Sequence, residues 1–348
     1  MILRTETVEQ SVDIDEVVTL EKQVVMTPGR EPLGMVRKRL PPPAEPRGTV
    51  LLVHGFGQNR YTWHVAGRSF SAYLAREGWD VFNCDLRGHG RSRRFGSQRP
   101  RVLEEYIRED VPALASEALR ISGDERIFLI GHSMGGIISY GAAATGLRQK
   151  TSGIVSIGSP YLFGTGSRTL SAVSAVLNTF RNTGVFDSNP RLPLRLVGRH
   201  LHKRRRLWDS RFWLSPIRPW TPGSVEDSVL DDYLSRAFDW SSLEIAFDIF
   251  RAGKDGVLAG RHGRSNYRAA FEHLDRPLLV IAGTRDHLAP PESVRPACRG
   301  SRSRDKTYRA FPMGHVDLIV GREAPKTVWP TVSEWLARRA TYGQVSAG

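Results

Sequence analysis

The sequence predicts an α/β fold with a mostly parallel central sheet, helices on both faces and a helical cap insertion. Short continuous apolar runs recur along the chain, each followed by turn residues, as expected for strands that are buried on both faces. Helical patterns separate these runs, and such alternation is the signature of a parallel sheet. The alternation stops at residue 161 and resumes near residue 270, which indicates an insertion.

Local signals place the individual elements. Two β segments are expected within 16–40, because Pro28-Gly29 marks a turn between them and Pro41-Pro42-Pro43 ends the second. The buried strands that follow are expected at 49–55, 79–86, 126–131, 152–160, 276–283 and 306–311. Helices are expected at 66–77, 102–121, 134–144, 291–299 and 325–340.

The chain is long enough for one large domain or two ordinary ones. We expect a core domain formed by residues 1–160 and 271–348, and a cap or lid formed by 161–270. A loop of that length without secondary structure would be unusual, so the insertion is expected to be mostly helical and to lie over the carboxyl edge of the sheet.

Composition excludes several classes of protein. Hydrophobic residues make up 40% and charged residues 25% of the 348 residues, which argues against a disordered chain, a collagen and a disulfide-stapled miniprotein. The two cysteines, Cys84 and Cys298, are interpreted as bystanders. No apolar run reaches the roughly 18 residues that a membrane span needs. The polar, acidic N-terminus does not resemble a secretory signal, so a cytoplasmic protein is expected.

Positive charge is concentrated in the insertion. The formal net charge is +14, and residues 191–220 hold nine basic residues against a single acidic one. Lys203-Arg204-Arg205-Arg206 precedes Leu207 and Trp208, a pairing that allows weak contact with an anionic membrane surface. The alternative is a solvated cap face whose aromatic side chains pack inward. No nucleic-acid-binding motif accompanies the charge, so nucleic acid is not an expected partner.

The strongest functional signal is the stretch from Gly131 to Gly135, which reads Gly-His-Ser-Met-Gly. This G-x-S-x-G motif follows a predicted strand and precedes a predicted helix, which is the context of a nucleophile elbow. Ser133 is the candidate nucleophile. The Met134 N–H, at the start of the helix, would point to where a tetrahedral oxyanion forms.

A serine hydroxyl needs a base, and the base needs a group that holds its tautomer. In this topology the chain order is serine, then acid, then histidine. Asp286 follows the strand at 276–283, and His315 follows the strand at 306–311. They are the candidate acid and base. Asp317 lies too close to His315 in sequence to be preferred, and His287 is interpreted as a bystander.

The second oxyanion donor is expected from the loop that follows the strand at 49–55. The Phe56 N–H is the first candidate and the Gly57 N–H the second, because glycine lets the backbone turn an N–H inward. Phe56 and Met134 also suggest an apolar acyl site.

Together these motifs resemble the α/β-hydrolase superfamily. The matching pieces run in family order: VHGFG at 53–57, DLRGHGRS at 85–92, GHSMGG at 131–136, GTRD at 283–286 and GH at 314–315. The front half is similar to acid lipases, and the tail at 314–336 is similar to relatives of polyhydroxyalkanoate synthases. Those synthases use a cysteine nucleophile, and dehalogenases and epoxide hydrolases of this fold use aspartate. The resemblance therefore implies hydrolysis through an acyl-serine, with Ser133, Asp286 and His315 as the triad and Phe56 and Met134 as oxyanion donors.

The function expected from the sequence is a serine carboxylesterase or lipase acting on a hydrophobic, medium-chain or long-chain ester. An acyltransferase, a thioesterase and a cofactor-free perhydrolase with the same triad remain open, as does a catalytically silent binding protein. No cofactor or metal is expected, because no phosphate loop, dinucleotide fingerprint or zinc-ligand spacing is present. Apolar side chains of the insertion either line an acyl pocket or pack the cap onto the core. They are Leu192, Leu194, Leu196, Leu201, Leu207, Trp208, Phe212 and Trp213.

Overall fold

The computed structural model describes residues 1–163, 165–167, 171, 191–210, 212, 218–250 and 267–345. The described residues form a large sheet of nine strands in the order β1-β2-β3-β5-β4-β6-β7-β10-β11. Trp213 lies outside the described residues, so the structure does not test the expectation for it.

The parallel part of the sheet carries the segments that hold the candidate site. Its strands are β4 (Thr49–Val53), β5 (Asp80–Asp85), β6 (Ile127–His132), β7 (Thr151–Ile157), β10 (Leu278–Gly283) and β11 (Lys306–Phe311). All neighbouring pairs among these six strands are parallel. The carboxyl ends of these strands therefore meet at the same edge of the sheet.

The N-terminal part of the sheet is antiparallel and longer than expected. The strands β2 (Glu16–Met26) and β3 (Gly34–Arg39) correspond to the two predicted β segments. They are joined by β1 (Ile2–Asp13), which pairs antiparallel with β2. We did not predict β1 from the sequence. It is an edge strand and mostly exposed, so it lacks the buried apolar run that reveals the interior strands.

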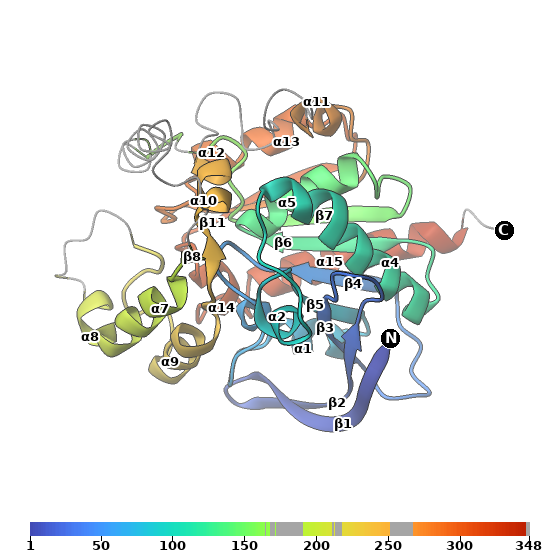
Figure 1. The fold of residues 1–348 in the computed structure, drawn as a ribbon, viewed down its shortest axis with the longest axis horizontal. Helices are drawn as coiled ribbons and strands as arrows, with labels where there is room; N and C mark the ends of the chain where they lie inside the picture. Colours follow the sequence, from blue (N-terminus) through green and yellow to red (C-terminus); the bar gives the residue numbers. More distant parts are fainter. Residues whose placement is uncertain are drawn as a thin grey trace.

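Helices cover both faces of the sheet (Figure 1). On one face, α4 (Val111–Ser122), α5 (Met134–Ala144) and α11 (Tyr267–Glu272) bury their apolar side chains in a single cluster with the sheet. On the other face, α1 (Phe70–Arg76), α14 (Asp317–Val320) and α15 (Val328–Val345) contribute to a second cluster. Shorter elements connect them: η1 (Arg60–Trp63), α2 (Gly90–Arg94), α3 (Leu103–Glu105), the π-helical turn Tyr106–Asp110, α12 (Pro291–Val294) and α13 (Pro296–Gly300).

We call residues 191–210 and 218–250 the cap segment. It contains α7 (Leu194–Lys203), α8 (Arg205–Trp208), α9 (Asp227–Arg236) and α10 (Leu243–Phe250). Its two short strands, β8 (Arg191–Leu192) and β9 (Ser241–Ser242), pair antiparallel with each other. The helices α7, α8 and α9 lie together beside the carboxyl edge of the sheet (Figure 1).

Apolar side chains of the cap segment divide between packing and exposure. Leu201 is buried in the second cluster, and Trp208 packs partly buried against the same cluster. The exposed members are Leu196, Leu207 and Phe212. The predicted apolar set therefore does not act as one pocket lining. Among the described residues, no helix is both long and apolar enough to cross a membrane.

Candidate active site

The elbow between β6 and α5 has the geometry that the motif predicts. Ser133 has φ 54° and ψ −123°, and it is the one non-glycine residue with positive φ in the described chain. A Cβ on Gly131 would overlap the backbone of Gly135, and a Cβ on Gly135 would overlap the carbonyl of Val53. The close approach of strand and helix therefore requires both glycines, and the strained turn holds Ser133 at the start of α5.

His315 and Asp286 form a direct buried pair. The His315 Nδ1 and Asp286 Oδ2 atoms are 2.7 Å apart, and both residues are about 95% or more buried. The other carboxylate oxygen, Oδ1, accepts hydrogen bonds of 2.8 Å from the Leu288 and Ala289 N–H groups. Because the carboxylate accepts the Nδ1–H, the Nε2 atom of His315 is left to accept a proton.

Ser133 lies at the same edge of the sheet as this pair. Its N–H donates to the carbonyl of Ile157 at the end of β7. The next residue, Gly158, is so close to the pair that a Cβ there would lie 3.3 Å from both Asp286 Oδ2 and His315 Nδ1. Within the described residues no hydrogen bond joins the Ser133 hydroxyl to His315. Such bonds are often long in enzymes without bound substrate and tighten when it binds.

His132 packs against His315. Its ring centroid is 4.6 Å from that of His315, and its Nε2 lies 3.2 Å from the His315 carbonyl oxygen. Burial lowers the pKa of His132 well below its usual value, and the neighbouring His315 lowers it further. His132 therefore stays neutral and donates its proton to the backbone that carries His315.

The loop after β4 borders Ser133. A Cβ on Gly55 would lie 3.2 Å from Ser133 Cβ, so the loop that carries Phe56 reaches the nucleophile. Neither the Phe56 N–H nor the Met134 N–H donates a hydrogen bond to another group of the described chain. Both donors therefore remain available for an incoming oxyanion.

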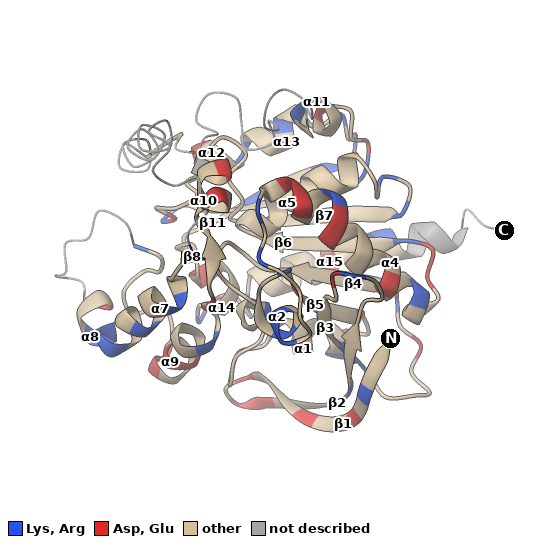
Figure 2. Ribbon diagram, in the orientation of Figure 1, with Lys and Arg blue, Asp and Glu red and all other residues tan. Residues whose placement is uncertain are grey.

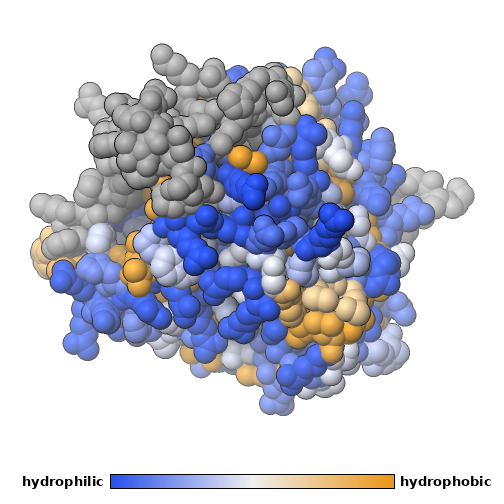
Figure 3. Space-filling model, viewed as in Figure 1, coloured by the Kyte–Doolittle hydropathy of each residue, from blue (hydrophilic) through white to orange (hydrophobic). Residues whose placement is uncertain are grey.

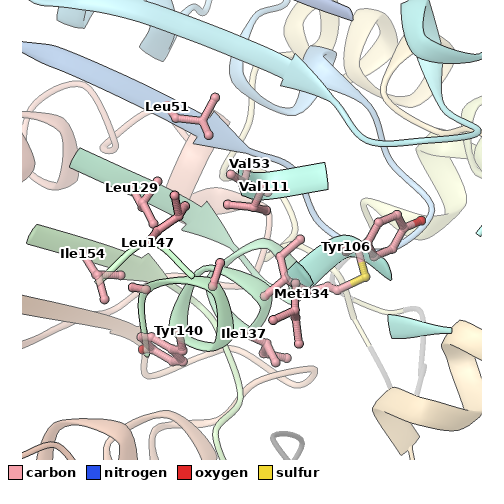
Figure 4. Close-up of a cluster of buried hydrophobic side chains, with 14 of the residues drawn as sticks. Leu51, Val53, Tyr106, Val111, Leu129, Met134, Ile137, Tyr140, Leu147 and Ile154 are labelled. Atoms are coloured by element: carbon pink, nitrogen blue, oxygen red, sulfur yellow. The ribbon is translucent and has the colours of Figure 1, made fainter. Parts of the chain in front are cut away.

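The side chain of Met134 is placed differently from its N–H. It is 2% exposed and belongs to the core cluster beneath α5, where it points toward Tyr106 (Figure 4). Phe56 is half-buried and packs partly against the same cluster. The Met134 side chain therefore belongs to the core and does not support the suggestion of an apolar acyl site.

The cap segment contacts both loops of the candidate site. On the oxyanion side, the Gln58 amide Nε2 donates to the Tyr233 hydroxyl over 2.6 Å, and the Asp239 N–H donates to the Gly57 carbonyl. On the histidine side, the Val316 N–H donates to the Pro219 carbonyl.

Asp317 connects the histidine loop to the cap segment. It is buried, and its Oδ2 accepts from the Gly314 N–H over 2.8 Å and from the Thr221 N–H over 3.0 Å. Burial raises the pKa of Asp317, and these backbone donors oppose that effect. Gln58, Tyr233 and Asp317 were not predicted as site residues. Gln58 lies within the HGFGQ motif, but its partner is 175 residues away and no sequence pattern marks Tyr233.

Charged side chains of the DLRGHG stretch at 85–90 form buried ion pairs. The Asp85 carboxylate accepts from the Arg60 and Arg91 N–H groups and pairs with the Arg60 guanidinium over 2.8 Å. Arg87 pairs with Asp110 on the other side of the turn. In the described part of the chain, no group of three or more His, Cys, Asp or Glu side chains is arranged to hold a metal ion.

Comparison with known proteins identifies the class. Residues 48–322 match the family described as the alpha/beta hydrolase fold, so the chain belongs to the α/β-hydrolase family. The fold and family resemblance predicted from the motifs is thereby confirmed.

Individual relatives include poly(3-hydroxyalkanoate) polymerase subunits, monoglyceride lipases and epoxide hydrolases. The chain is 24% identical over 317 residues to the poly(3-hydroxyalkanoate) polymerase subunit PhaC of Haloferax mediterranei, covering 84% of this chain and 59% of that protein. It thus spans about three fifths of the length of that relative. It is 26% identical over 306 residues to a putative monoglyceride lipase of Schizosaccharomyces pombe, covering 86% and 68% of the two chains. The crystal structure of Paleococcus ferrophilus monoacylglycerol lipase superposes with a TM-score of 0.60 at 22% identity, over 88% of this chain and 99% of that one.

Proposed function

We propose that this protein is a serine hydrolase that cleaves a carboxylic ester of a hydrophobic substrate through an acyl-serine intermediate. The observation that carries the proposal is the strained Ser133 elbow at the same sheet edge as the hydrogen-bonded His315–Asp286 pair. The similarity to proteins named monoglyceride lipase supports an ester of glycerol with one acyl chain as the first substrate class to test. In this proposal, residues 161–270 act as the cap.

The residues would divide the reaction as follows. His315 Nε2 takes the Ser133 proton as Oγ attacks the ester carbonyl, and the Phe56 and Met134 N–H groups bind the oxyanion. Collapse of the tetrahedral intermediate breaks the ester bond, and His315 returns the proton to the leaving alcohol. Water, deprotonated by His315, then attacks the acyl-serine. As this second tetrahedral intermediate collapses, His315 returns the proton to Ser133 Oγ and the carboxylic acid leaves. Asp286 keeps the Nδ1–H in place throughout and stabilises the imidazolium.

Acyl transfer is the second candidate, because the chain is also similar to a polymerase subunit that joins acyl units. The two reactions share every step up to the acyl-serine and differ only in the acceptor. A transferase would use an alcohol in place of water, and a perhydrolase would use hydrogen peroxide in place of water. A thioesterase would use a thioester in place of the ester. Ser133 stands where synthases of the family carry cysteine, which favours hydrolysis.

The experiment is a turnover assay with p-nitrophenyl esters and monoacylglycerols of graded acyl length. Ser133→Ala should reduce turnover by at least about a thousandfold while leaving the fold intact, because it removes the nucleophile and little packing. Ser139→Ala, farther along α5, is the matched control and should keep its activity. A fluorophosphonate should label wild type and the control but not Ser133→Ala. Near-wild-type turnover or labelling of Ser133→Ala would overturn the proposal, and acylated alcohol as the main product would favour transfer.

A further inference from the structure

A second, strongly basic pocket lies between the cap segment and the core, outside the candidate active site. The pocket has a volume of about 210 Å³. Five arginines line it: Arg60 in η1, Arg93 and Arg94 in α2, Arg195 in α7, and Arg236 at the end of α9. Figure 2 shows basic segments in both α2 and α7. The wall is therefore built from two parts of the chain more than 100 residues apart.

Three of these arginines already have a carboxylate partner. Arg60 pairs with Asp85, Arg93 with Asp239 over 2.9 Å, and Arg236 with Asp232 over 2.7 Å.

The carboxylates have little capacity left. Asp85 also accepts from two backbone N–H groups, and Asp239 also accepts from the Gly90 and Trp240 N–H groups. Asp239 itself lines the pocket. Each of the three carboxylates offsets the charge of one arginine, so Arg94 and Arg195 are left without a carboxylate partner among the described residues.

Arg94 and Arg195 have no ion-pair partner in the described part of the chain, and both are exposed. They approach the pocket from opposite sides, Arg94 from the core and Arg195 from the cap segment. Two like charges that line one small pocket repel each other unless an anion lies between them. The pocket thus has an excess of positive charge and the donors to bind an anion.

Aromatic contacts hold part of this wall in place. The Tyr61 ring contacts two guanidinium groups, with Arg60 4.4 Å and Arg236 5.5 Å from its centroid. Phe238, just after α9, also lines the pocket. Guanidinium groups fixed in this way lose less entropy on binding a ligand than free arginine side chains do.

We propose that this pocket binds a phosphate group, held by Arg94 and Arg195 and assisted by the other arginines. Guanidinium groups bind phosphate through two parallel N–H···O bonds, and this geometry favours phosphate over a spherical anion such as chloride. The volume suits inorganic phosphate or a small phosphomonoester. A phosphate bound here would link α7 to α2. Asn59 also lines the pocket, and it follows the loop that carries Phe56. This site is independent of the proposed esterase activity.

The first test is isothermal titration of the full chain with inorganic phosphate, against sodium chloride at the same ionic strength. We expect saturable phosphate binding that chloride does not reproduce. Arg94→Gln and Arg195→Gln should each weaken it by about tenfold, and the double variant should abolish it. Arg304→Gln, an exposed arginine on the loop before β11, is the matched control and should bind as wild type does. No phosphate binding by wild type, or equal binding by the double variant and the control, would overturn the proposal.

The second test identifies the source of the phosphate group. Glycerol 3-phosphate in solution is compared with vesicles that contain phosphatidic acid, using the same variants. Binding of glycerol 3-phosphate that depends on Arg94 and Arg195 supports a soluble phosphomonoester. Vesicle binding with the same dependence, and none to the soluble compound, supports a lipid headgroup. Binding to neither, or binding that does not depend on the two arginines, contradicts the site. Thermal unfolding in chloride verifies that the variants are folded.

Discussion

The two parts of the molecule that meet at the candidate site are built in different ways. In the core, parallel strands buried on both faces place Ser133, Asp286 and His315 by backbone geometry. In the cap segment, short helices bury apolar side chains such as Leu230 and Leu234 of α9 in the second cluster. Polar contacts add to this packing: Arg205 pairs with Asp227 and Asp231 over 2.7 Å each, and Tyr233 binds Gln58. The proposed chemistry therefore depends on the core. The cap segment would align the loop that carries Phe56 and would contact anionic membranes through polar side chains, which single substitutions can remove.

The face seen in Figure 3 is mostly hydrophilic, with separate apolar patches, one of them near α7. Leu196 and Val197 on that helix are 49% and 45% exposed. The large apolar clusters lie inside, on the two faces of the sheet.

The sharpest test of the core is Asp286→Asn. The amide can no longer hold the Nδ1–H tautomer of His315 or stabilise its cation, so kcat should fall by roughly a hundredfold to ten-thousandfold with KM little changed. Steady-state kinetics on a p-nitrophenyl ester measure this. Asp317→Asn, two residues after the histidine, is the comparison. A larger loss of kcat in Asp317→Asn than in Asp286→Asn would move the acid role to Asp317.

The buried core residue His54 should make the free energy of unfolding depend on pH. His54 is fully buried, with its Nδ1 2.9 Å from the Gly55 carbonyl and its Nε2 accepting from the Leu86 N–H. Burial and, to a smaller extent, the neighbouring His89 lower the pKa of His54 to about 4. Between pH 6.5 and 4 the unfolded chain binds a proton that the folded chain excludes. The stability from this neutral histidine is therefore complete above about pH 6.5 and lost as the pH falls, by about 3 kcal/mol in total.

Urea unfolding between pH 4 and 7.5 measures this loss. His54→Gln should show a smaller loss in this window than wild type, because the site no longer resists protonation. His273→Gln, at an exposed position near the end of α11, should behave as wild type does. Parallel pH profiles for His54→Gln and wild type would contradict the role assigned to His54.

The contact between cap and core is tested by Tyr233→Phe. Loss of the hydroxyl leaves the buried Gln58 amide without this partner, at a cost of about 1–3 kcal/mol. Because Gln58 follows the loop that carries Phe56, kcat should fall several-fold while KM changes little. Tyr308→Phe, on β11 outside this contact, is the matched control.

A double variant separates positioning from simple loss of stability. Gln58→Leu removes the hydrogen bond to Tyr233 and also the one from the Thr62 hydroxyl. Combined with Tyr233→Phe, it should therefore lose no more activity than Gln58→Leu alone. Additive losses would show that the two residues act independently, and an unchanged kcat in Tyr233→Phe would mean that the core alone positions the loop.

The smallest expected effect is weak binding of the cap segment to anionic membranes. In the described part of the chain no ion pair involves Lys203, Arg204 or Arg206, whereas Arg205 is paired with α9. Each basic residue contributes about 1 kcal/mol at most near an anionic surface, and salt weakens it. Replacing these three residues with glutamine should reduce co-sedimentation with anionic vesicles, whereas Arg205→Gln should disturb the packing of α8 on α9. Equal binding to neutral and anionic vesicles, or binding to neither, would support a solvated cap face.

Much of the core could be predicted because its signals are local. The buried strands appear as continuous apolar runs, and the elbow is defined by five adjacent residues whose glycines are required by the close approach of β6 and α5. The helix predicted at 134–144 and the strand predicted at 306–311 have the bounds of α5 and β11. Asp286 and His315 could be chosen because each directly follows a strand of a parallel sheet, whose carboxyl ends meet at one edge.

What the tertiary structure decided involves pairs of residues that are far apart in sequence. The strand β1 is polar and exposed, and only its pairing with β2 makes it part of the sheet. The partners of Gln58, Asp317 and Arg205 depend on how the cap segment lies against the core. Arg94 and Arg195 of the basic pocket have no ion-pair partner among the described residues, and this is evident only once the ion pairs of the other three arginines are known. A pattern in neighbouring residues reports burial and turns, because these depend on local geometry. It does not report which of many similar polar side chains will meet, because the fold of the whole chain determines those distances.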